Sequence, residues 1–385
     1  MADDGSAKPP DLGAGSGLAI SLVRQPDRGF RAAAARNLGA SVADGEVLLF
    51  LDGDTVPEPD YVRRLARLPG LAPEALVVGR RRHADLTGWD PDRLARWFGA
   101  AGEGPVELAE PEWLCEGYAA SRDLLVADER SYRYVISAVC GLSRDLFTEL
   151  GGFSEEFTTY GGEDWELSHR AWVAGALFAH VPAAVAWHDG ADWAERGERA
   201  PGDKNPETRA LARLLPDPVA RGGGQWFPFP AVVVTLPDHD PEATLATARW
   251  AFRGDTDCGV WLTGPTAAAT VRVLGDPRIR SGPVPHPVLA RAVAMVELTG
   301  PARLEDLAGL VRQALRVGPV DFPAGTITPG RAARRAARWA DALGADPSSR
   351  QALLFGGQDV NAPTSLTSVD LAHELKYVGQ PVRRS

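Results

Sequence analysis

The stretch Val47-Leu48-Leu49-Phe50-Leu51-Asp52-Gly53-Asp54 joins an apolar run to two carboxylates. A short apolar run without polar alternation is typical of a central, parallel-type strand that is covered on both faces. Ligand sites of open α/β sheets lie outside the carboxyl ends of their strands. Asp52 and Asp54 therefore stand where such a site is expected, although an Asp-x-Asp pair is also common in surface turns.

The chemistry of this pair points to a cation. Two carboxylates one residue apart repel each other unless a positive charge lies near them. Hard divalent ions take such oxygens together with the phosphate oxygens of a substrate. The pattern therefore indicates metal-assisted binding of a phosphorylated ligand.

The segments around this strand alternate between strand and helix signals. Upstream, residues 18–23 predict a strand, and the alanine-rich residues 29–43 predict a helix that Gly45 ends. Downstream, the pattern predicts helices over Asp60–Leu68, Arg144–Leu150 and Asp164–Ala174, and strands over Val135–Leu142 and Ala183–Trp187. This alternation predicts an α/β layered domain. We interpret residues 80–130, which include Trp89, Trp97, Phe98 and Trp113, as a long, partly helical excursion over the site.

A second motif lies at residues 151–170, which read Gly-Gly-Phe-Ser-Glu-Glu-Phe-Thr-Thr-Tyr-Gly-Gly-Glu-Asp-Trp-Glu-Leu-Ser-His-Arg. Alone, its Glu163 and Asp164 are also explained as carboxylates favoured at a helix N-terminus. In this order and spacing, the two motifs together resemble the inverting glycosyltransferases of family 2, which have the GT-A fold. The second motif is similar to the C-terminal segment shared with galactosyltransferase-type enzymes. The resemblance covers about residues 1–190.

The resemblance implies a Rossmann-like, mostly parallel sheet and the transfer of a sugar from a nucleotide-sugar to a hydroxyl of a glycan or small-molecule acceptor. A UDP-sugar donor is favoured by family habit alone. Asp54 is implied as a ligand of Mn²⁺ or Mg²⁺ that holds the diphosphate, with Asp52 beside it. His188, in Ala-Trp-His-Asp, matches a further metal ligand. A lone histidine is otherwise more often structural.

The remaining site roles are implied in the same way. Asp164 matches the catalytic base that accepts a proton from the acceptor hydroxyl, and Glu163 would orient the base or contact the acceptor. The nucleotide-sugar contacts would be Asp4, Arg36, Asp52, Gly53 and Asp54, and the acceptor contacts Tyr160, Gly161, Gly162 and Glu163. The two glycines would let the backbone approach the sugar closely. A helix-surface role for Arg36 and a core role for Tyr160 stay open.

The chain departs from the family pattern at its start. The family domain opens with a strand, a helix and a second strand that ends in Asp-Asp-Gly-Ser, and here that signature stands at residues 3–6. We therefore expect the opening strand and helix to be missing. Either the true start lies upstream or the domain is truncated, which would leave an open sheet edge.

The second half of the chain repeats the strand–helix rhythm. Residues 190–223 are rich in Arg, Glu, Pro and Gly and are the best linker candidate. We therefore expect a glycosyltransferase domain over residues 1–222, a second, smaller α/β domain over 223–355 and a loose tail over 356–385. The expected elements of the second domain are strands Ala231–Leu236, Val260–Leu262 and Ala294–Leu298 and helices Pro241–Phe252, Thr266–Leu274, Leu304–Leu315 and Arg331–Leu343.

This second domain resembles a degenerate GT-A-like half. Ala294–Thr299 stands where a metal-binding strand would fall, but it lacks the two acids. We interpret Asp238, His239 and Asp240 as a turn and helix cap rather than a metal cluster. The helical spacing of Arg331, Arg334, Arg335 and Arg338 favours a solvated face, with contact to an anionic acceptor or membrane surface as the alternative.

Composition limits the other classes of function. The net charge of −10 disfavours a duplex nucleic-acid binder, which needs a basic footprint. Three distant cysteines support neither a disulfide framework nor a zinc cluster and fit a reducing cytoplasm. The acidic start is not a signal peptide, and no apolar run has the roughly 18 residues of a membrane helix. We expect a cytoplasmic protein, with peripheral contact at the inner face of the membrane as an alternative.

Two hypotheses about the function remain. One is the active, metal-dependent glycosyltransferase, and the other is a catalytically weak or inactive GT-A-fold scaffold or partner subunit. The missing opening strand favours the scaffold, whereas the intact acids and His188 favour the enzyme. A nucleotidyltransferase would need a glycine-rich phosphate loop near the start, and the sequence has none there.

Overall fold

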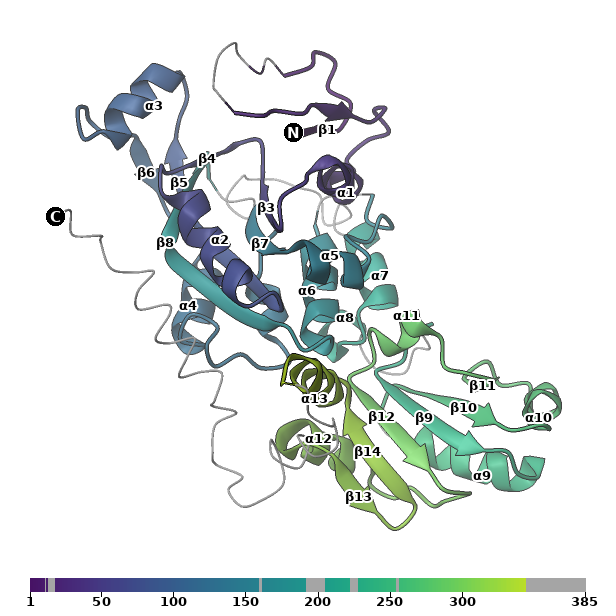
Figure 1. The fold of residues 1–385 in the computed structure, drawn as a ribbon. Helices are drawn as coiled ribbons and strands as arrows, with labels where there is room; N and C mark the ends of the chain where they lie inside the picture. The colour runs from purple at the N-terminus through teal and green to yellow at the C-terminus, as the bar shows by residue number, and fades with distance from the viewer. Residues whose placement is uncertain are drawn as a thin grey trace. The chain divides into compact units, whose positions relative to one another are not determined.

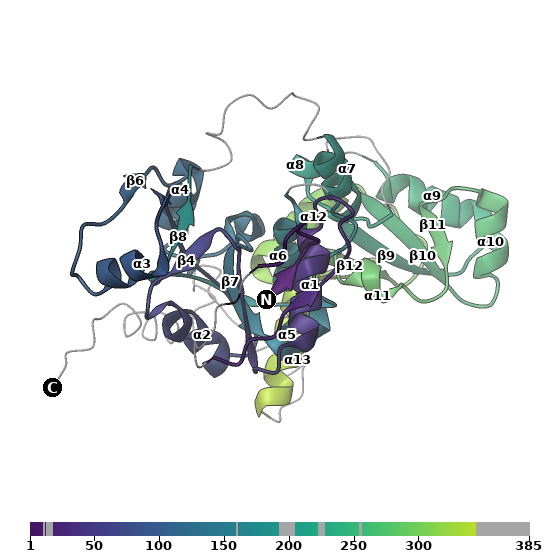
Figure 2. The ribbon, with the colours of Figure 1, turned by 90° about the horizontal axis from the view of Figure 1, so that it is seen from above.

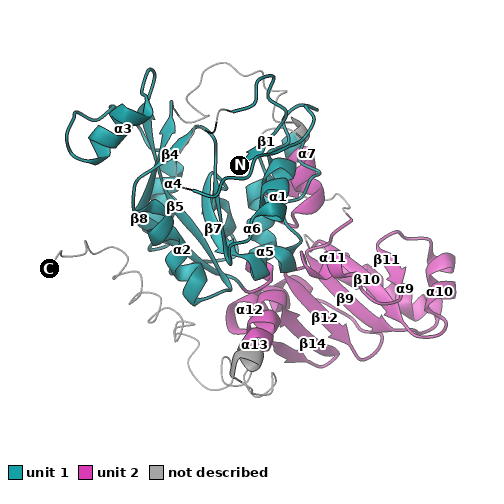
Figure 3. Cartoon of the chain, turned by 45° about the horizontal axis from the view of Figure 1, so that its top comes forward, with its two compact units in different colours: residues 1–171, 176–207, 364–385 teal, residues 172–175, 208–363 magenta. Residues whose placement is uncertain are grey.

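Each of two compact units is built around its own β-sheet (Figure 1). Of the residues described below, the first unit holds Met1–Ala171 and Ala176–Glu207, and the second holds Trp172–Gly175 and residues 208–343 (Figure 3). The computed structural model describes residues 1–10, 12, 18–158, 161–191, 205–221, 228–253 and 256–343. The domain boundary at residue 222 and the loose tail over 356–385 lie outside these residues, so the proposed domain division stays a prediction.

The sheet of the first unit is mixed. Its strands follow the order β3 (Val47–Leu51), β7 (Val139–Ser143), β5 (Ala75–Asp85), β8 (Leu177–Asp189) and β4 (Thr55–Pro57), with β6 (Val106–Leu108) beside β5. Among the described strands of this sheet, β5 and β8 pair in parallel and the other pairs are antiparallel. The α/β class is confirmed, with a sheet that is less parallel than expected.

Strand β3, which precedes the Asp-x-Asp pair, has the predicted bounds but not the predicted position in the sheet. It pairs with β7 alone among the described strands, and that pairing is antiparallel, so the prediction of a central parallel strand is wrong. Leu48 and Phe50 are buried, whereas Leu51 is 38% exposed. All five residues line an open pocket. The apolar run is therefore buried on the face of Leu48 and Phe50 and less covered on the face of Val47, Leu49 and Leu51.

The helices of the first unit lie around the sheet, and four of them also contribute residues to the pocket lining. They are α1 (Ala32–Val42), α2 (Tyr61–Leu71), α3 (Pro91–Phe98), α4 (Glu112–Ala120), α5 (Arg144–Leu150) and α6 (Glu163–Val173), with a 3₁₀ turn at Ser131–Tyr134. Helix α2 crosses one face of the sheet over β5, β7 and β8. Figures 1 and 2 show α3 and α1 at opposite sides of the unit. The excursion predicted over 80–130 resolves into the end of β5, α3, β6 and α4.

The start of the chain forms a separate parallel pair of strands, β1 (Ala2–Asp3) and β2 (Val23–Arg24). The strand predicted over residues 18–23 is therefore wrong except for its last residue. Its apolar side chains are not covered, since Leu18 is 74% and Ile20 44% exposed. The larger apolar residues at every second position, Leu18, Ile20 and Leu22, have the pattern of a half-buried strand although they do not form one.

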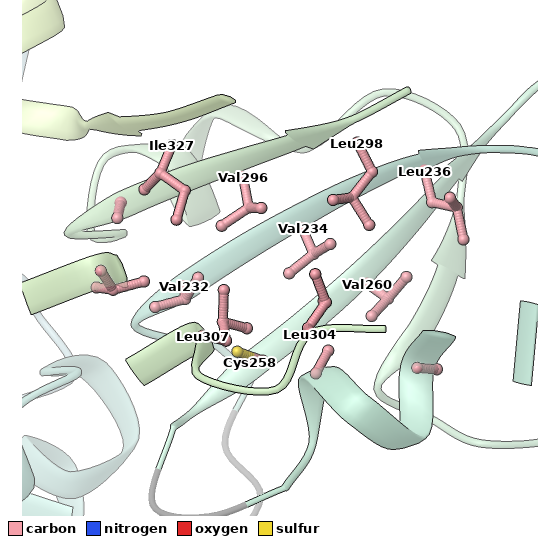
Figure 4. Packing of buried hydrophobic residues seen from close by; sticks show 14 of the residues in the cluster. Val232, Val234, Leu236, Cys258, Val260, Val296, Leu298, Leu304, Leu307 and Ile327 are labelled. Atoms are coloured by element: carbon pink, nitrogen blue, oxygen red, sulfur yellow. The ribbon is translucent and has the colours of Figure 1, made fainter. Parts of the chain in front are cut away.

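The second unit has a sheet in the order β11 (Ile279–Ser281), β10 (Cys258–Thr263), β9 (Val232–Pro237), β12 (Ala294–Leu298), β14 (Gly325–Pro329) and β13 (Val320–Phe322). Parallel pairing joins β11, β10, β9 and β12, and antiparallel pairing adds β14 and β13. Val234, Val260 and Val296 are fully buried at the centre of its core (Figure 4). The three longest predicted strands are confirmed, while β11, β13 and β14 were missed because they lack an apolar run.

Helices α9 (Pro241–Ala251), α10 (Ala267–Leu274), α12 (Leu307–Val317) and α13 (Gly330–Leu343) lie close to their predicted bounds, and α7 (Asn205–Leu214), α8 (Pro218–Arg221) and α11 (His286–Leu289) are additional. Asp240 caps α9 by accepting from the amides of Glu242 and Ala243, which confirms the predicted helix cap. Arg331 and Arg338 donate to the carbonyls of Trp172 and Ala174 in the same unit. The predicted solvated arginine face is therefore wrong for these two side chains.

Candidate active site

The Asp-x-Asp segment is a β-turn that follows β3. The amide of Thr55 donates to the carbonyl of Asp52 at 3.1 Å, and the amide of Asp52 donates to the carbonyl of Ala138 at 3.3 Å. The turn begins where the β3–β7 ladder ends, so its side chains stand at the carboxyl end of the strand. Asp52, Gly53 and Asp54 all line the pocket, as the sequence predicted.

Strand register brings His188 to Asp54. Thr55 in β4 lies opposite His188 in β8, and the amide of Asp189 donates to the carbonyl of Asp54 at 2.9 Å. His188 Nδ1 then lies 3.3 Å from Asp54 Oδ1. This contact is the main reason that the pKa of Asp54 lies below its usual value. Two residues 134 positions apart in the sequence are thus in contact, and their role as ligands of one metal ion stays a prediction.

A bulge between β5 and β8 sets this register. Gly79 pairs with Val181, but the next residue, Arg80, pairs with Val185. A Cβ atom at Gly79 would lie 2.7 Å from the carbonyl oxygen of Ala184, so the close approach requires glycine. Bulges next to active sites re-aim the residues that follow them. Here the re-aimed half of β8 carries His188.

Asp54 and His188 suit a hard divalent ion. Ligands about 2.1 Å from an ion and at adjacent octahedral positions lie roughly 3 Å apart, which is close to the observed 3.3 Å. Within the described residues no group of three or more His, Cys, Asp or Glu side chains forms a metal cluster. Protein ligands that are this few fit an ion that keeps water and takes substrate phosphate oxygens. Asp52 pairs with Arg36 instead, so its role toward a metal stays a prediction.

The first turn of α6 supplies two more carboxylates. Gly161 and Gly162 precede it with φ of +97° and +92°, a conformation that favours glycine. Glu163 is 5% exposed, and Asp164 is half-buried and lines the pocket. Tyr160, the predicted stacking residue, lies outside the described residues.

Arg36 ties the two motifs together. Its Nη2 donates to Asp52 Oδ1 at 2.7 Å and its Nη1 donates to Glu163 Oε1 at 2.8 Å. Burial alone would lower the pKa of Arg36, but the two carboxylates outweigh it and raise the pKa. Arg36 is therefore a linking cation, not a helix-surface arginine.

The same ion pairs separate the roles of Glu163 and Asp164. Glu163 is neutralised by Arg36, whereas Asp164 forms no ion pair in the described part of the chain. Burial first, and then repulsion from Glu163, raise the pKa of Asp164 to about 7. A carboxylate with a pKa near the working pH is suited to general-base catalysis.

Replacing Arg36 with methionine is expected to destabilise the first unit. Glu163 would be left as an unpaired buried carboxylate, a change that costs about 3–5 kcal/mol in other proteins. The half-exposed Asp52 can recover water, so we expect the lower end of that range. The melting temperature should fall by roughly 5–10 °C, as measured by calorimetry at pH 7.5.

The matched control is the double variant Arg36→Met with Glu163→Gln. It removes the orphaned charge and should recover part of the loss, because the two sites are coupled. A melting temperature within about 2 °C of the wild type for Arg36→Met alone would contradict the linking role.

Three positioning residues were missed from the sequence. Asn37 pairs with both main-chain groups of Phe153, accepting from its amide and donating to its carbonyl at 2.9 Å each. Arg170 holds Glu166 with two bonds of 2.6 and 2.7 Å and donates to the carbonyl of Gly152 at 2.8 Å. These contacts fix the main chain of Gly152 and Phe153 in the segment that precedes α6. Asn37 lies next to Arg36, and Glu166 lies two residues after Asp164, so both motifs supply the residues that hold this segment.

Asp4 has a structural partner as well as a place in the pocket. Its Oδ2 accepts from the amide of Arg31 at 2.7 Å, and its Oδ1 accepts from the Gln25 side chain. It lines the same pocket as Asp54 and Asp164. A contact between Asp4 and a nucleotide stays a prediction.

The acids of the Asp-x-Asp and Glu-Asp pairs, Arg36 and His188 line one pocket of the first unit, with a volume of about 1560 Å³. The carboxylates in its lining outnumber the arginines, and Arg36 pairs with two of those carboxylates, Asp52 and Glu163. The pocket also has a wall that the sequence did not assign to the site, made by Arg81, Trp113, Glu116, Arg133 and Tyr134.

Comparison with known families agrees with this arrangement. Residues 2–123 match the model of glycosyl transferase family 2, and residues 126–187 match the model described as the N-terminal domain of galactosyltransferase. The first segment contains Arg36, Asp52 and Asp54, and the second contains Glu163 and Asp164. About the first half of this chain is therefore similar to glycosyl transferase family 2 and to galactosyltransferases. The expected resemblance and the α/β fold class are confirmed over that segment.

Curated relatives match about half of this chain. The hyaluronan synthase of Pasteurella multocida is 27% identical over 213 residues, which cover 51% of this chain and 21% of that protein. The validoxylamine A glucosyltransferase of Streptomyces hygroscopicus subsp. jinggangensis is 30% identical over 213 residues and is covered to 46% of its length. The matches thus span less than half the length of these relatives. A solved structure of GalNAc-T7 with UDP, GalNAc and Mn²⁺ matches 50% of this chain and 35% of its own, with 21% identity and a TM-score of 0.33.

No helix of the described residues is both long and apolar enough to cross a membrane.

Proposed function

We propose that this chain is an inverting glycosyltransferase that moves a sugar from a nucleotide-sugar, with UDP as the nucleotide, to a hydroxyl of a glycan or small-molecule acceptor. The observation that carries the proposal is the meeting of Asp54 with His188 in the pocket that Asp164 also lines. The similarity to a hyaluronan synthase and to a validoxylamine A glucosyltransferase supports both kinds of acceptor.

Asp54 and His188 would hold Mn²⁺ or Mg²⁺. When bound, the ion neutralises the charge that develops on the departing diphosphate. Arg36 would keep Asp52 and Glu163 in place and offset part of their charge, so that the acidic pocket accepts an anionic donor.

Asp164 would accept the proton of the acceptor hydroxyl as that oxygen bonds to the anomeric carbon and the bond to the diphosphate breaks. One base and one displacement are enough, so the configuration at the anomeric carbon inverts. Glu163 cannot share this task easily, because its charge is already paired with Arg36.

The three cysteines form no disulfides, which supports our proposal of a cytoplasmic location.

A donor panel tests the proposal. We expect the purified chain to release UDP from at least one UDP-sugar when Mn²⁺ is present and to stop when EDTA is added. A coupled UDP assay with NMR of the product anomer checks both release and inversion. Binding of UDP without turnover over a broad set of donors and acceptors would favour the alternative, a weak or inactive GT-A scaffold.

A further inference from the structure

One face of helix α4 is turned to the pocket rather than to a core. Trp113, Glu116, Gly117 and Ala120 all line the pocket. Their spacing is that of one stripe along a helix. On another side of the helix Leu114 is 4% exposed. Helix α4 therefore packs by one face and presents a tryptophan to the open site by the other.

The exposed tryptophan is part of a built aromatic wall. Trp113 is 42% exposed, and its ring centre lies 6.3 Å from that of Tyr134 with the planes 32° apart. A Cβ atom at Gly117 would lie 2.3 Å from Tyr134 Cε1, so the Tyr134 ring rests directly on the helix backbone. The Tyr118 hydroxyl donates to the carbonyl of Tyr134 at 2.8 Å. Ring, helix and main chain are thus fixed before any ligand arrives.

Such a wall matches the shape of a pyranose. A sugar ring has C–H groups on its faces and hydroxyls around its rim. The negative face of an aromatic ring attracts those C–H groups, while rim hydroxyls need donors and acceptors nearby. Glu116 lies one turn after Trp113 on the same stripe, and Arg133 places its Cζ 6.0 Å from the centre of the Tyr134 ring. An apolar surface with a few polar groups is the usual make-up of a small-ligand site.

We propose that Trp113 and Tyr134 form a platform on which the acceptor pyranose stacks, with Glu116 accepting hydrogen bonds from its hydroxyls. The acceptor is then a pyranoside, either a glycan end or a small glycoside. This proposal rests on the proposed function only in calling the bound sugar the acceptor. Binding of a pyranoside at Trp113 is measurable without any turnover.

The test uses the full chain with Mn²⁺ and UDP, and methyl β-D-glucopyranoside and methyl N-acetyl-β-D-glucosaminide as probes. Saturation-transfer NMR should show contact along one face of the sugar. The indole N–H signal of Trp113, identified by its absence in Trp113→Phe, should shift when a probe is added to the wild type. Sorbitol, an acyclic polyol, should not shift it.

We expect Trp113→Ala to weaken binding of at least one probe about tenfold and Trp113→Phe to restore most of it. Glu116→Gln should weaken binding, whereas its neighbour Glu112→Gln should not, because Glu112 does not line the pocket. Trp89→Ala is the matched aromatic control, since Trp89 is also partly exposed in the first unit but lies outside the pocket lining.

An unmoved Trp113 signal with both probes, or Trp113→Ala binding within twofold of the wild type, overturns the platform. Metal-dependent release of UDP together with that result leaves the proposed function standing and removes the platform alone. A shifted Trp113 signal without turnover of any donor keeps the platform and removes the enzyme. The wild-type NMR measurement decides the matter even if Trp113→Ala fails to fold.

Discussion

Asp164→Asn is expected to lower kcat by about a hundredfold to ten-thousandfold, the range that a positioned general base contributes. Asparagine keeps the shape of the side chain but cannot accept the proton of the acceptor hydroxyl. Glu163 cannot replace it, because Arg36 already holds that carboxylate at 2.8 Å. Donor binding should change little, so the loss should appear in kcat rather than in the KM for the donor.

The pH profile provides a second readout of the same change. The pKa of Asp164 is raised to about 7 by burial and by Glu163, and the base acts only when ionised. In the wild type, kcat/KM should therefore rise as the pH increases through about 7 and level off above it. A bound divalent ion favours the ionised form and would move this limb to lower pH. The limb should be absent from the residual activity of Asp164→Asn.

Stability separates a lost base from a lost fold. A carboxyl whose pKa is raised by folding stabilises the native state below its unfolded pKa and loses that contribution as the pH rises through the folded value. Above pH 7 the native protein holds an unfavourable charge at Asp164, so Asp164→Asn should melt at a higher temperature than the wild type at pH 8. That difference should shrink as the pH is lowered towards 4.

Asp145→Asn is the matched control, because Asp145 lies in the first turn of α5, is exposed and does not line the pocket. It should leave kcat and its pH limb unchanged. Wild-type kcat in Asp164→Asn, or an unaltered pH limb in that variant, would remove Asp164 from the role of base.

The sequence predicts the location of the site better than it predicts which strands pair in the sheet. An apolar run followed by Asp52 and Asp54 predicts a strand end with carboxylates, because both features are local. Which strand lies beside Val47–Leu51 is not local: the partner β7 begins at Val139, and no pattern within either strand chooses between parallel and antiparallel pairing. The apolar run predicts a strand covered on both faces, but the face of Val47, Leu49 and Leu51 is only partly covered.

The contacts of the site were predictable only where a family motif fixed them. Asp54 and His188 could be paired by resemblance, whereas the bond of Arg36 to Glu163 spans 127 positions and depends on how α1 and α6 approach. Trp113 was noted as one aromatic among several in residues 80–130. Its contact with Tyr134 involves a ring that rests on Gly117, which no periodicity within α4 reveals.

Asp54→Ala is expected to reduce metal-dependent UDP release by roughly a hundredfold or more, because the diphosphate charge would develop without its neutralising ion. The pKa of Asp54 is lowered chiefly by its hydrogen bond with His188, so the wild-type carboxylate is ionised and ready to bind a cation at neutral pH. Calorimetric titration with Mn²⁺ should show weaker binding in the variant. Asp60→Ala, which removes a carboxylate paired with Arg63 and Arg64 outside the pocket, should bind Mn²⁺ as the wild type does.

The contact between Asp54 and His188 leads to a further prediction for a double variant. If both side chains hold one ion, removing either already abolishes the site, and the double variant Asp54→Ala with His188→Ala should lose little more activity than Asp54→Ala alone. Two independent roles would instead multiply the two losses. His188→Ala should also raise the Mn²⁺ concentration needed for half-maximal activity, whereas a histidine that merely packs between β4 and β5 would lower stability and leave that concentration unchanged. Full multiplication of the losses, with unaltered Mn²⁺ affinity in both single variants, would place the metal elsewhere in the pocket.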